Sequence, residues 1–127
     1  MNPTLADVVD GSRPVHIVER DVEHVAFLAE RPVTPGHTIV CTVAVADSVL
    51  DLDEEASARL WSFVRGVALR MRDRLPCARV CVSVIGWAVR HAHVHLIPTD
   101  KPGEVPGLDG EPLPDQVMHE LATRLRR

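Results

Sequence analysis

Residues 91–98 read His-Ala-His-Val-His-Leu-Ile-Pro, with a histidine at every second position of the first five. Alternate side chains of a β-strand lie on the same face, so the pattern predicts three imidazoles on one face, spaced about 6.7 Å apart, and apolar groups on the other. A shuffled chain with this histidine content would contain such a triplet roughly two per cent of the time. His91, His93 and His95 are therefore predicted to form the functional site.

The segment before these histidines predicts a hairpin and a long helix. Residues 79–85 and 88–97 are rich in β-branched side chains and are separated only by Gly86 and Trp87, which favours a tight hairpin. Further upstream, Asp51 followed by Glu54 is an N-cap signature. Apolar residues then recur every three or four positions, so a helix is predicted from about Leu52 to Leu75. Its apolar stripe comprises Leu52, Ala56, Leu60, Phe63, Val67, Met71 and Leu75.

The remaining segments complete one domain over residues 1–127. A short helix is predicted at residues 4–9 and strands at 15–18, 24–28 and 37–45. Residues 98–114 are rich in Pro and Gly and predict a loop or arm, after which Asp115 caps a C-terminal helix over 115–127. Short connections between strands favour an antiparallel sheet. The predicted fold class is α+β, with five antiparallel strands covered by one long helix and a further C-terminal helix.

Composition limits the possible partners and compartments. The net charge of −4 argues against a general nucleic-acid binder. No window approaches the eighteen or so apolar residues of a membrane span, and the N-terminus lacks the pattern of a signal peptide. The three cysteines do not form a Cys-x-x-Cys motif, which favours a reducing cytoplasm over a disulfide framework. We expect a small-molecule substrate, with no nucleic acid and no membrane.

The chemistry of a histidine face admits three interpretations. Neutral imidazoles at alternate positions are good metal ligands. One imidazole, aligned by the others, could instead act as a nucleophile. The histidines could also be surface residues on a solvated strand. The residues by themselves leave the metal site and the nucleophile open.

The pattern His-φ-His-φ-His-φ-φ at residues 91–97 resembles the signature of the histidine triad (HIT) superfamily. The similarity extends from about Pro14 to Pro98 and includes Val25-Ala-Phe-Leu28, Pro32-Val-Thr-Pro-Gly-His37 and the helix from Asp51. Pro35-Gly36-His37 is most similar to the fragile histidine triad, or dinucleoside polyphosphate hydrolase, branch.

The resemblance implies a nucleotide hydrolase or nucleotidyltransferase that works as a homodimer and requires no cofactor. It makes His93 the nucleophile, which forms a covalent nucleotidyl intermediate, with Nδ1–H held by the carbonyl of His91. It further implies that His95 and His37 contact the phosphate and leaving group and that His91 supports the geometry. Phe27 and the positions of Trp87 and Ala88 would adjoin the substrate.

The chain departs from the family pattern in its phosphate loop. Trp87 and Ala88 stand where relatives carry Gln and Ser or Thr, the loop before them is about five residues shorter, and Ala29 replaces a ribose-binding residue. Two polar contacts to the transition state are therefore missing. Trp87 is expected either to pack against the edge of the sheet or to wall off the nucleotide pocket, and the substrate is expected to be atypical.

Two alternatives follow from these departures. His37, His91, His93 and His95 could together hold Zn or Cu and act on a small substrate that is not a nucleotide. The domain could also be a non-catalytic binding module.

Overall fold

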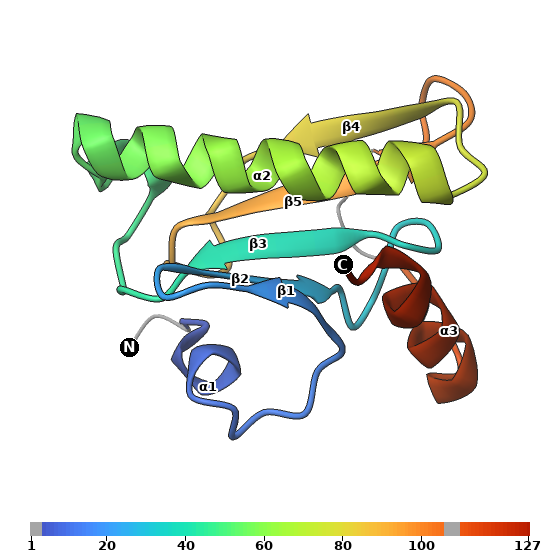
Figure 1. Ribbon diagram of the computed structural model, residues 1–127, viewed down its shortest axis with the longest axis horizontal. Coiled ribbons are helices and arrows are strands. Elements are labelled where there is room, and N and C mark those ends of the chain that lie inside the picture. Colours follow the sequence, from blue (N-terminus) through green and yellow to red (C-terminus); the bar gives the residue numbers. More distant parts are fainter. Residues whose placement is uncertain (1–3, 106–109) are drawn as a thin grey trace.

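The computed structural model describes residues 4–105 and 110–127 of the protein. Its five strands form one antiparallel sheet in the order β1-β2-β3-β5-β4, which confirms the predicted α+β class (Figure 1). In chain order the elements are α1 (Ala6–Val9), β1 (Ile17–Arg20), β2 (His24–Leu28), β3 (Thr38–Thr42), the 3-10 helix η1 (Val49–Asp51), α2 (Glu54–Arg74), β4 (Arg79–Ser83), β5 (His93–Thr99) and α3 (Asp115–Leu125).

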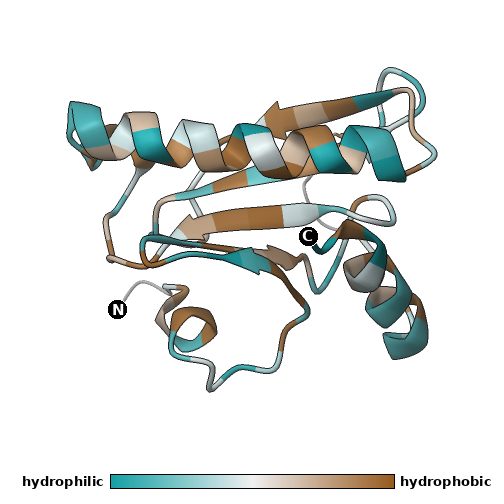
Figure 2. Ribbon diagram, viewed as in Figure 1, coloured by the Kyte–Doolittle hydropathy of each residue, from teal (hydrophilic) through white to brown (hydrophobic). Residues whose placement is uncertain are grey.

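The sheet buries apolar side chains on both faces. Figure 1 shows α2 on one side of the sheet and α1 on the other. The larger core lies under α2 and α3, where Val40, Val94 and Leu96 of the central strands meet apolar residues of both helices. A smaller cluster on the opposite face joins Val8 of α1 to apolar groups of β2 and β3. The two faces therefore bury alternate residues of the same strands, such as Val40 and Cys41 of β3. Figure 2 shows apolar colouring along most of β3.

The long helix forms as predicted, but it begins at a different residue. Its N-cap is Asp53, whose carboxylate accepts from the backbone N–H of Ala56 at 2.8 Å. Asp51, which we expected to be the N-cap, instead completes a capping box with Ser48 around η1. Two competing Asp residues lie two positions apart, and the geometry of the preceding turn decides which one caps the helix. Buried positions follow the predicted period along α2 and comprise Leu60, Val64, Val67 and Met71.

The tight hairpin at Gly86 and Trp87 was a wrong prediction. β4 ends at Ser83 and β5 starts at His93, so residues 84–92 form a nine-residue connection. The backbone N–H of Ala92 donates to the carbonyl of Ala46 at 2.7 Å, which draws this segment toward the connection after β3 instead of toward β4. His91 consequently lies outside the strand. A β-branched sequence favours extended backbone, but it does not select the neighbour with which that backbone pairs.

Other boundaries shift by a few residues. The strand predicted at 37–45 spans Thr38–Thr42, that at 15–18 spans Ile17–Arg20, and β5 continues beyond Ile97 to Thr99. Asp115 is the first residue of α3, and Pro114 is the N-cap. The predicted loop over 98–114 includes residues 106–109, which lie outside the described residues. Across the helices of the described ranges, none combines the length and the apolar character needed to cross a membrane.

Candidate active site

The catalytic candidates lie on the face of the sheet opposite α2. β5 is a central strand, paired with β3 on one side and β4 on the other. His93 is opposite Cys41 and His95 is opposite Ile39, so their side chains share the face that carries the smaller apolar cluster. Both histidines are buried, with 8% of each exposed. The alternation predicted from the sequence therefore holds for these two residues.

The ring of His93 is held by the backbone of the residue two positions before it. Nδ1 lies 2.5 Å from the carbonyl oxygen of His91, and a carbonyl can only accept a hydrogen bond. Nδ1 therefore carries the proton, and Nε2 of the neutral ring keeps its lone pair. No hydrogen-bond partner of Nε2 occurs among residues 4–105 and 110–127. His93 thus presents one available nucleophilic nitrogen.

His37 and His95 form a direct hydrogen-bonded pair. The backbone N–H of Val33 donates to Nδ1 of His37 at 3.0 Å, which places the proton of the neutral ring on Nε2. This Nε2–H then donates to Nδ1 of His95 over 2.9 Å. By the same reasoning, neutral His95 carries its proton on Nε2. A backbone amide thereby orients His95 as a hydrogen-bond donor beside the lone pair of His93.

Burial keeps these imidazoles neutral. Desolvation lowers the pKa of His37 from 6.5 to about 4, and the pKa of His95 falls to about 4 for the same reason, with further repulsion from the charged forms of His37 and His93. Burial also lowers the pKa of His93, although its bond to the carbonyl of His91 opposes the shift. At neutral pH the site therefore offers one lone pair and one N–H donor without a net charge.

His91 is separated from the other histidines. It lies in the bend before β5 and is completely buried. Its Nδ1 accepts from the backbone N–H of Leu5 at 3.0 Å, and its Nε2–H donates to the carbonyl of Thr42 at 2.6 Å. The prediction of a strand face with three histidines was therefore wrong for His91, because β5 begins only at His93. Its ring connects the N-terminal segment to β3.

The hydrogen bonds do not fit a metal site built from all four histidines. Both nitrogens of His91 and both of His37 are engaged by backbone or ring partners, and Nδ1 of His95 accepts from His37. Only Nε2 of His93 retains a lone pair that could bind a metal without breaking one of these bonds. Within the described residues, no group of three or more His, Cys, Asp and Glu has a metal-binding arrangement.

The predicted contacts Phe27, Trp87 and Ala88 lie in two different environments. Phe27 is buried in the small apolar cluster with Val8 and Cys41. Ala88 is exposed, and 82% of Trp87 is exposed. With this exposure, Trp87 neither packs against the edge of the sheet nor fills a pocket, and it lies in the connection between β4 and β5 instead of on a strand. Ser83, which was not among the predicted site residues, lies opposite His95, and the alternation in residues 79–83 is the signal that marks it for this face.

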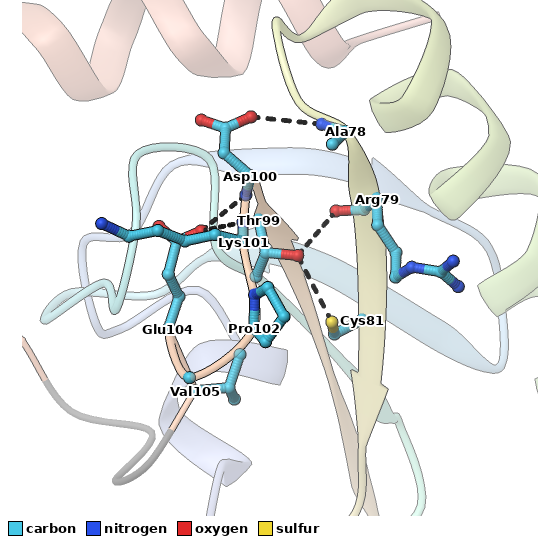
Figure 3. Close-up of a pocket in the computed structure, with 10 residues that line it drawn as sticks. Ala78, Arg79, Cys81, Thr99, Asp100, Lys101, Pro102, Glu104 and Val105 are labelled. Atoms are coloured by element: carbon cyan, nitrogen blue, oxygen red, sulfur yellow. Dashed lines mark hydrogen bonds between the residues drawn. The ribbon is translucent and has the colours of Figure 1, made fainter.

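A separate cavity of about 580 Å³ lies at the far end of β4 and β5. Figure 3 shows the hydroxyl of Thr99 directed toward Cys81 and the carbonyl of Arg79, while the charged ends of Arg79 and Lys101 extend to opposite sides. The carboxylate of Glu104 accepts from the backbone N–H groups of residues 100 and 101. The cations do not converge, so the cavity has no evident anion-binding geometry, and none of the four histidines lines it.

Comparisons with known proteins agree with this architecture. The protein-family model described as HIT domain matches residues 10–102. A HIT-like protein from Saccharolobus solfataricus is 30% identical over 98 residues, which cover 73% of this chain and 70% of that protein. The bis(5'-adenosyl)-triphosphatase of Dictyostelium discoideum is 28% identical over 81 residues, or 60% of this chain and 54% of that protein.

The fold is also found among solved structures. A hypothetical histidine triad nucleotide-binding protein from Sulfolobus tokodaii superimposes with a TM-score of 0.86 and 23% identity. The superposition covers 96% of this chain and 88% of that one. This likeness concerns the arrangement of the sheet and its helices.

Proposed function

Because this chain belongs to the HIT domain family, we propose that it is an enzyme that transfers or hydrolyses a nucleotidyl or other phosphoryl group through a covalent intermediate on His93. The observation that carries the proposal is the 2.5 Å bond from Nδ1 of His93 to the carbonyl of His91, which leaves Nε2 as a free nucleophile. The name of the Dictyostelium relative, a triphosphatase, supports phosphoryl chemistry.

In the first step, the lone pair of His93 Nε2 attacks the phosphorus atom. A P–N bond forms, and the bond to the leaving group breaks with its electron pair on the leaving atom, which solvent protonates. The positive charge that develops on the ring of His93 is stabilised by its hydrogen bond to the carbonyl of His91. The Nε2–H of His95 donates to a non-bridging oxygen, where negative charge accumulates. Water, or another acceptor, then attacks the phosphorus. The P–N bond breaks with its electron pair returning to Nε2 of His93, and the proton of the attacking group passes to solvent.

We propose that the substrate is narrower than a dinucleotide. The positions of Trp87 and Ala88 offer an exposed indole and a methyl group instead of an amide and a hydroxyl. The methyl group of Ala88 cannot donate a hydrogen bond to a phosphate, and Trp87 offers only the single donor of its indole N–H. A substrate with one phosphoryl group and an uncharged leaving group suits this loop better than a second nucleotide.

The exposed edge of the sheet supports a proposal about assembly. β4 is an edge strand, and apolar side chains are exposed along and after it, comprising Val82, Val84, Ile85 and Trp87. An unpaired strand with exposed apolar groups favours association. We propose a homodimer that pairs through β4.

The cysteines Cys41, Cys77 and Cys81 are free thiols, which supports a reducing cytoplasm.

The proposal is tested by trapping the intermediate. Purified protein is incubated with adenosine phosphoramidate or diadenosine triphosphate and quenched in base, and mass spectrometry locates the acid-labile adduct. We expect turnover of adenosine phosphoramidate, in preference to diadenosine triphosphate, and an adduct on His93, both lost in His93→Ala and kept in the exposed control His119→Ala. Turnover that survives in His93→Ala would contradict the mechanism. Binding without turnover or adduct would favour the non-catalytic module.

A further inference from the structure

We propose that the N-terminal segment, residues 4–10, is a working part of the active site, because it holds His91, a positioning residue whose carbonyl orients the nucleophile. This inference rests on the proposed function, since it assigns a role to His91 in the same reaction. The segment is remote in sequence, with Leu5 and His91 separated by 86 positions. Its role would be to fix the acceptor of the nucleophile in place before substrate binds.

The ring of His91 is a bridge between two backbone groups. On one side it accepts the N–H of Leu5 at 3.0 Å, and on the other it donates to the carbonyl of Thr42 at 2.6 Å. The ring is fully buried, so water cannot replace either partner without opening the structure. The two bonds together fix the position and tautomer of the ring. The main chain of His91 is thereby fixed relative to α1 and β3.

The backbone carries this constraint to the nucleophile. The carbonyl of His91 and the N–H of Ala92 belong to one planar peptide and point in opposite directions. The N–H donates to Ala46 at 2.7 Å, while the carbonyl accepts from Nδ1 of His93 at 2.5 Å. The carbonyl of Ala92 in turn accepts from Thr42, at 3.2 Å. A movement of His91 would therefore rotate or shift the acceptor that sets the tautomer of His93.

The segment depends on tertiary contacts to stay in place. α1 has only four residues, which is too short for a stable helix by itself. It is held by Val8, which is buried against Val25, Phe27 and Cys41, and by Arg20, which donates to the carbonyl of Val9 at 2.7 Å. Weakening the apolar contact should release the N–H of Leu5 from His91. The same contact lies on the face of the sheet that carries His93.

Replacing His91 by asparagine or by glutamine tests its two side-chain hydrogen bonds one at a time. In His91→Asn, the side-chain oxygen can occupy the place of Nδ1 and accept from Leu5, whereas the donor to Thr42 is lost. In His91→Gln, the side-chain nitrogen can reach the place of Nε2 and donate to Thr42, whereas the acceptor for Leu5 is lost. We expect His91→Gln to lower kcat about tenfold or more with KM unchanged, and His91→Asn to lower it less.

A second pair of variants tests the segment without altering a histidine. Val8→Ala removes two methyl groups from the cluster that holds α1, and Val18→Ala removes the same groups from the core under α2. Thermal unfolding measures the loss of stability in each variant, so that the two are compared at a similar loss. Val8→Ala should then lower kcat severalfold, and Val18→Ala should not. This pair decides the inference if His91→Gln fails to fold.

Nuclear magnetic resonance of ¹⁵N-labelled histidines supplies a readout that needs no substrate. We expect the Nδ1–H signal of His93 to move or broaden in His91→Gln and Val8→Ala, and to stay near its wild-type position in Val18→Ala. The inference is overturned if the signal and kcat are the same in Val8→Ala and Val18→Ala, or if His91→Gln matches the wild type in both. If the wild type shows no turnover, the proposed function fails and the signals alone decide the role of the segment.

Discussion

Nε2 of His37 lies 2.9 Å from Nδ1 of His95, and the direction of this hydrogen bond is set by a third group, the backbone amide of Val33. Since that amide donates to His37, the proton between the two rings belongs to His37, and the neutral ring of His95 must carry its own proton on Nε2. His37 is therefore a positioning residue, 58 positions away from the residue that it orients.

Two substitutions of His37 test whether its hydrogen bond to His95 matters for activity. His37→Phe leaves the N–H of Val33 and Nδ1 of His95 buried without partners, which should lower the free energy of unfolding by about 1–3 kcal/mol for each group. It should also lower kcat by at least about tenfold, because His95 is free to change tautomer. His37→Gln keeps a donor near Nε2 and should lose less activity. Equal kcat in the two variants would contradict the assigned proton positions. Steady-state kinetics and urea unfolding supply the measurements.

Acid should destabilise the fold within a defined window. The pKa values of His37 and His95 fall from 6.5 to about 4 on folding. Between these values the unfolded chain binds more protons than the folded protein, so the free energy of unfolding falls as the pH drops from about 6.5 to about 4. His37→Gln removes one of the two groups and should flatten the dependence on pH. Chemical denaturation at several pH values checks this expectation, which a flat wild-type curve would refute.

Gly36 should be irreplaceable at the turn before His37. Its φ of 96° lies in the left-handed region, and an added Cβ would lie 2.7 Å from Cδ1 of Leu75 and 3.3 Å from Cγ of Pro98. Gly36→Ala should therefore destabilise the protein by about 1–3 kcal/mol. Gly66, within α2, has no atom within 4 Å of an added Cβ, so Gly66→Ala should stabilise by about 0.5–1 kcal/mol. Thermal unfolding of both variants gives opposite signs if the geometry is correct.

The proposed dimer should be sensitive to charge on the outer edge of the sheet. Val82 is 52% exposed on β4, and Val82→Lys would place a cation in a pairing between two copies of this strand. We expect the wild type to sediment as a dimer and Val82→Lys as a folded monomer. Val22→Lys, at an exposed position in the turn between β1 and β2, is the control and should remain dimeric. A monomeric wild type at high micromolar concentration would refute the dimer.

The activity should not require a metal ion. Among His37, His91, His93 and His95, only one imidazole lone pair is available without disrupting the observed hydrogen bonds, so turnover should be unaffected by a chelator such as EDTA. Elemental analysis of purified protein provides an independent measurement. Stoichiometric zinc or copper that is removed in His93→Ala, together with the absence of nucleotide turnover, would instead favour the metal-dependent alternative.

The sequence by itself determined the fold class and the location of two catalytic candidates. Residues 93–99 form a strand because the alternation of histidines with apolar residues matches the period of two, and one face must be buried. The sequence also predicted the apolar stripe of α2, because its apolar residues recur with the helical period of 3.6 and form one face that packs against the sheet. Local signals of this kind specify which side chains face inward.

Tertiary structure alone decided the chemistry of each ring. The partners that assign the protons are backbone groups of Leu5, Val33, Thr42 and His91. Every residue carries a backbone carbonyl and every residue except proline carries an N–H, so no sequence pattern marks them. The same limitation explains why His91 was placed on the strand. The histidine pattern includes His91, but the N–H of Ala92 donates to Ala46 and β5 begins only at His93. The period of a segment determines its faces, whereas long-range hydrogen bonds determine where the segment ends and which nitrogen is free to react.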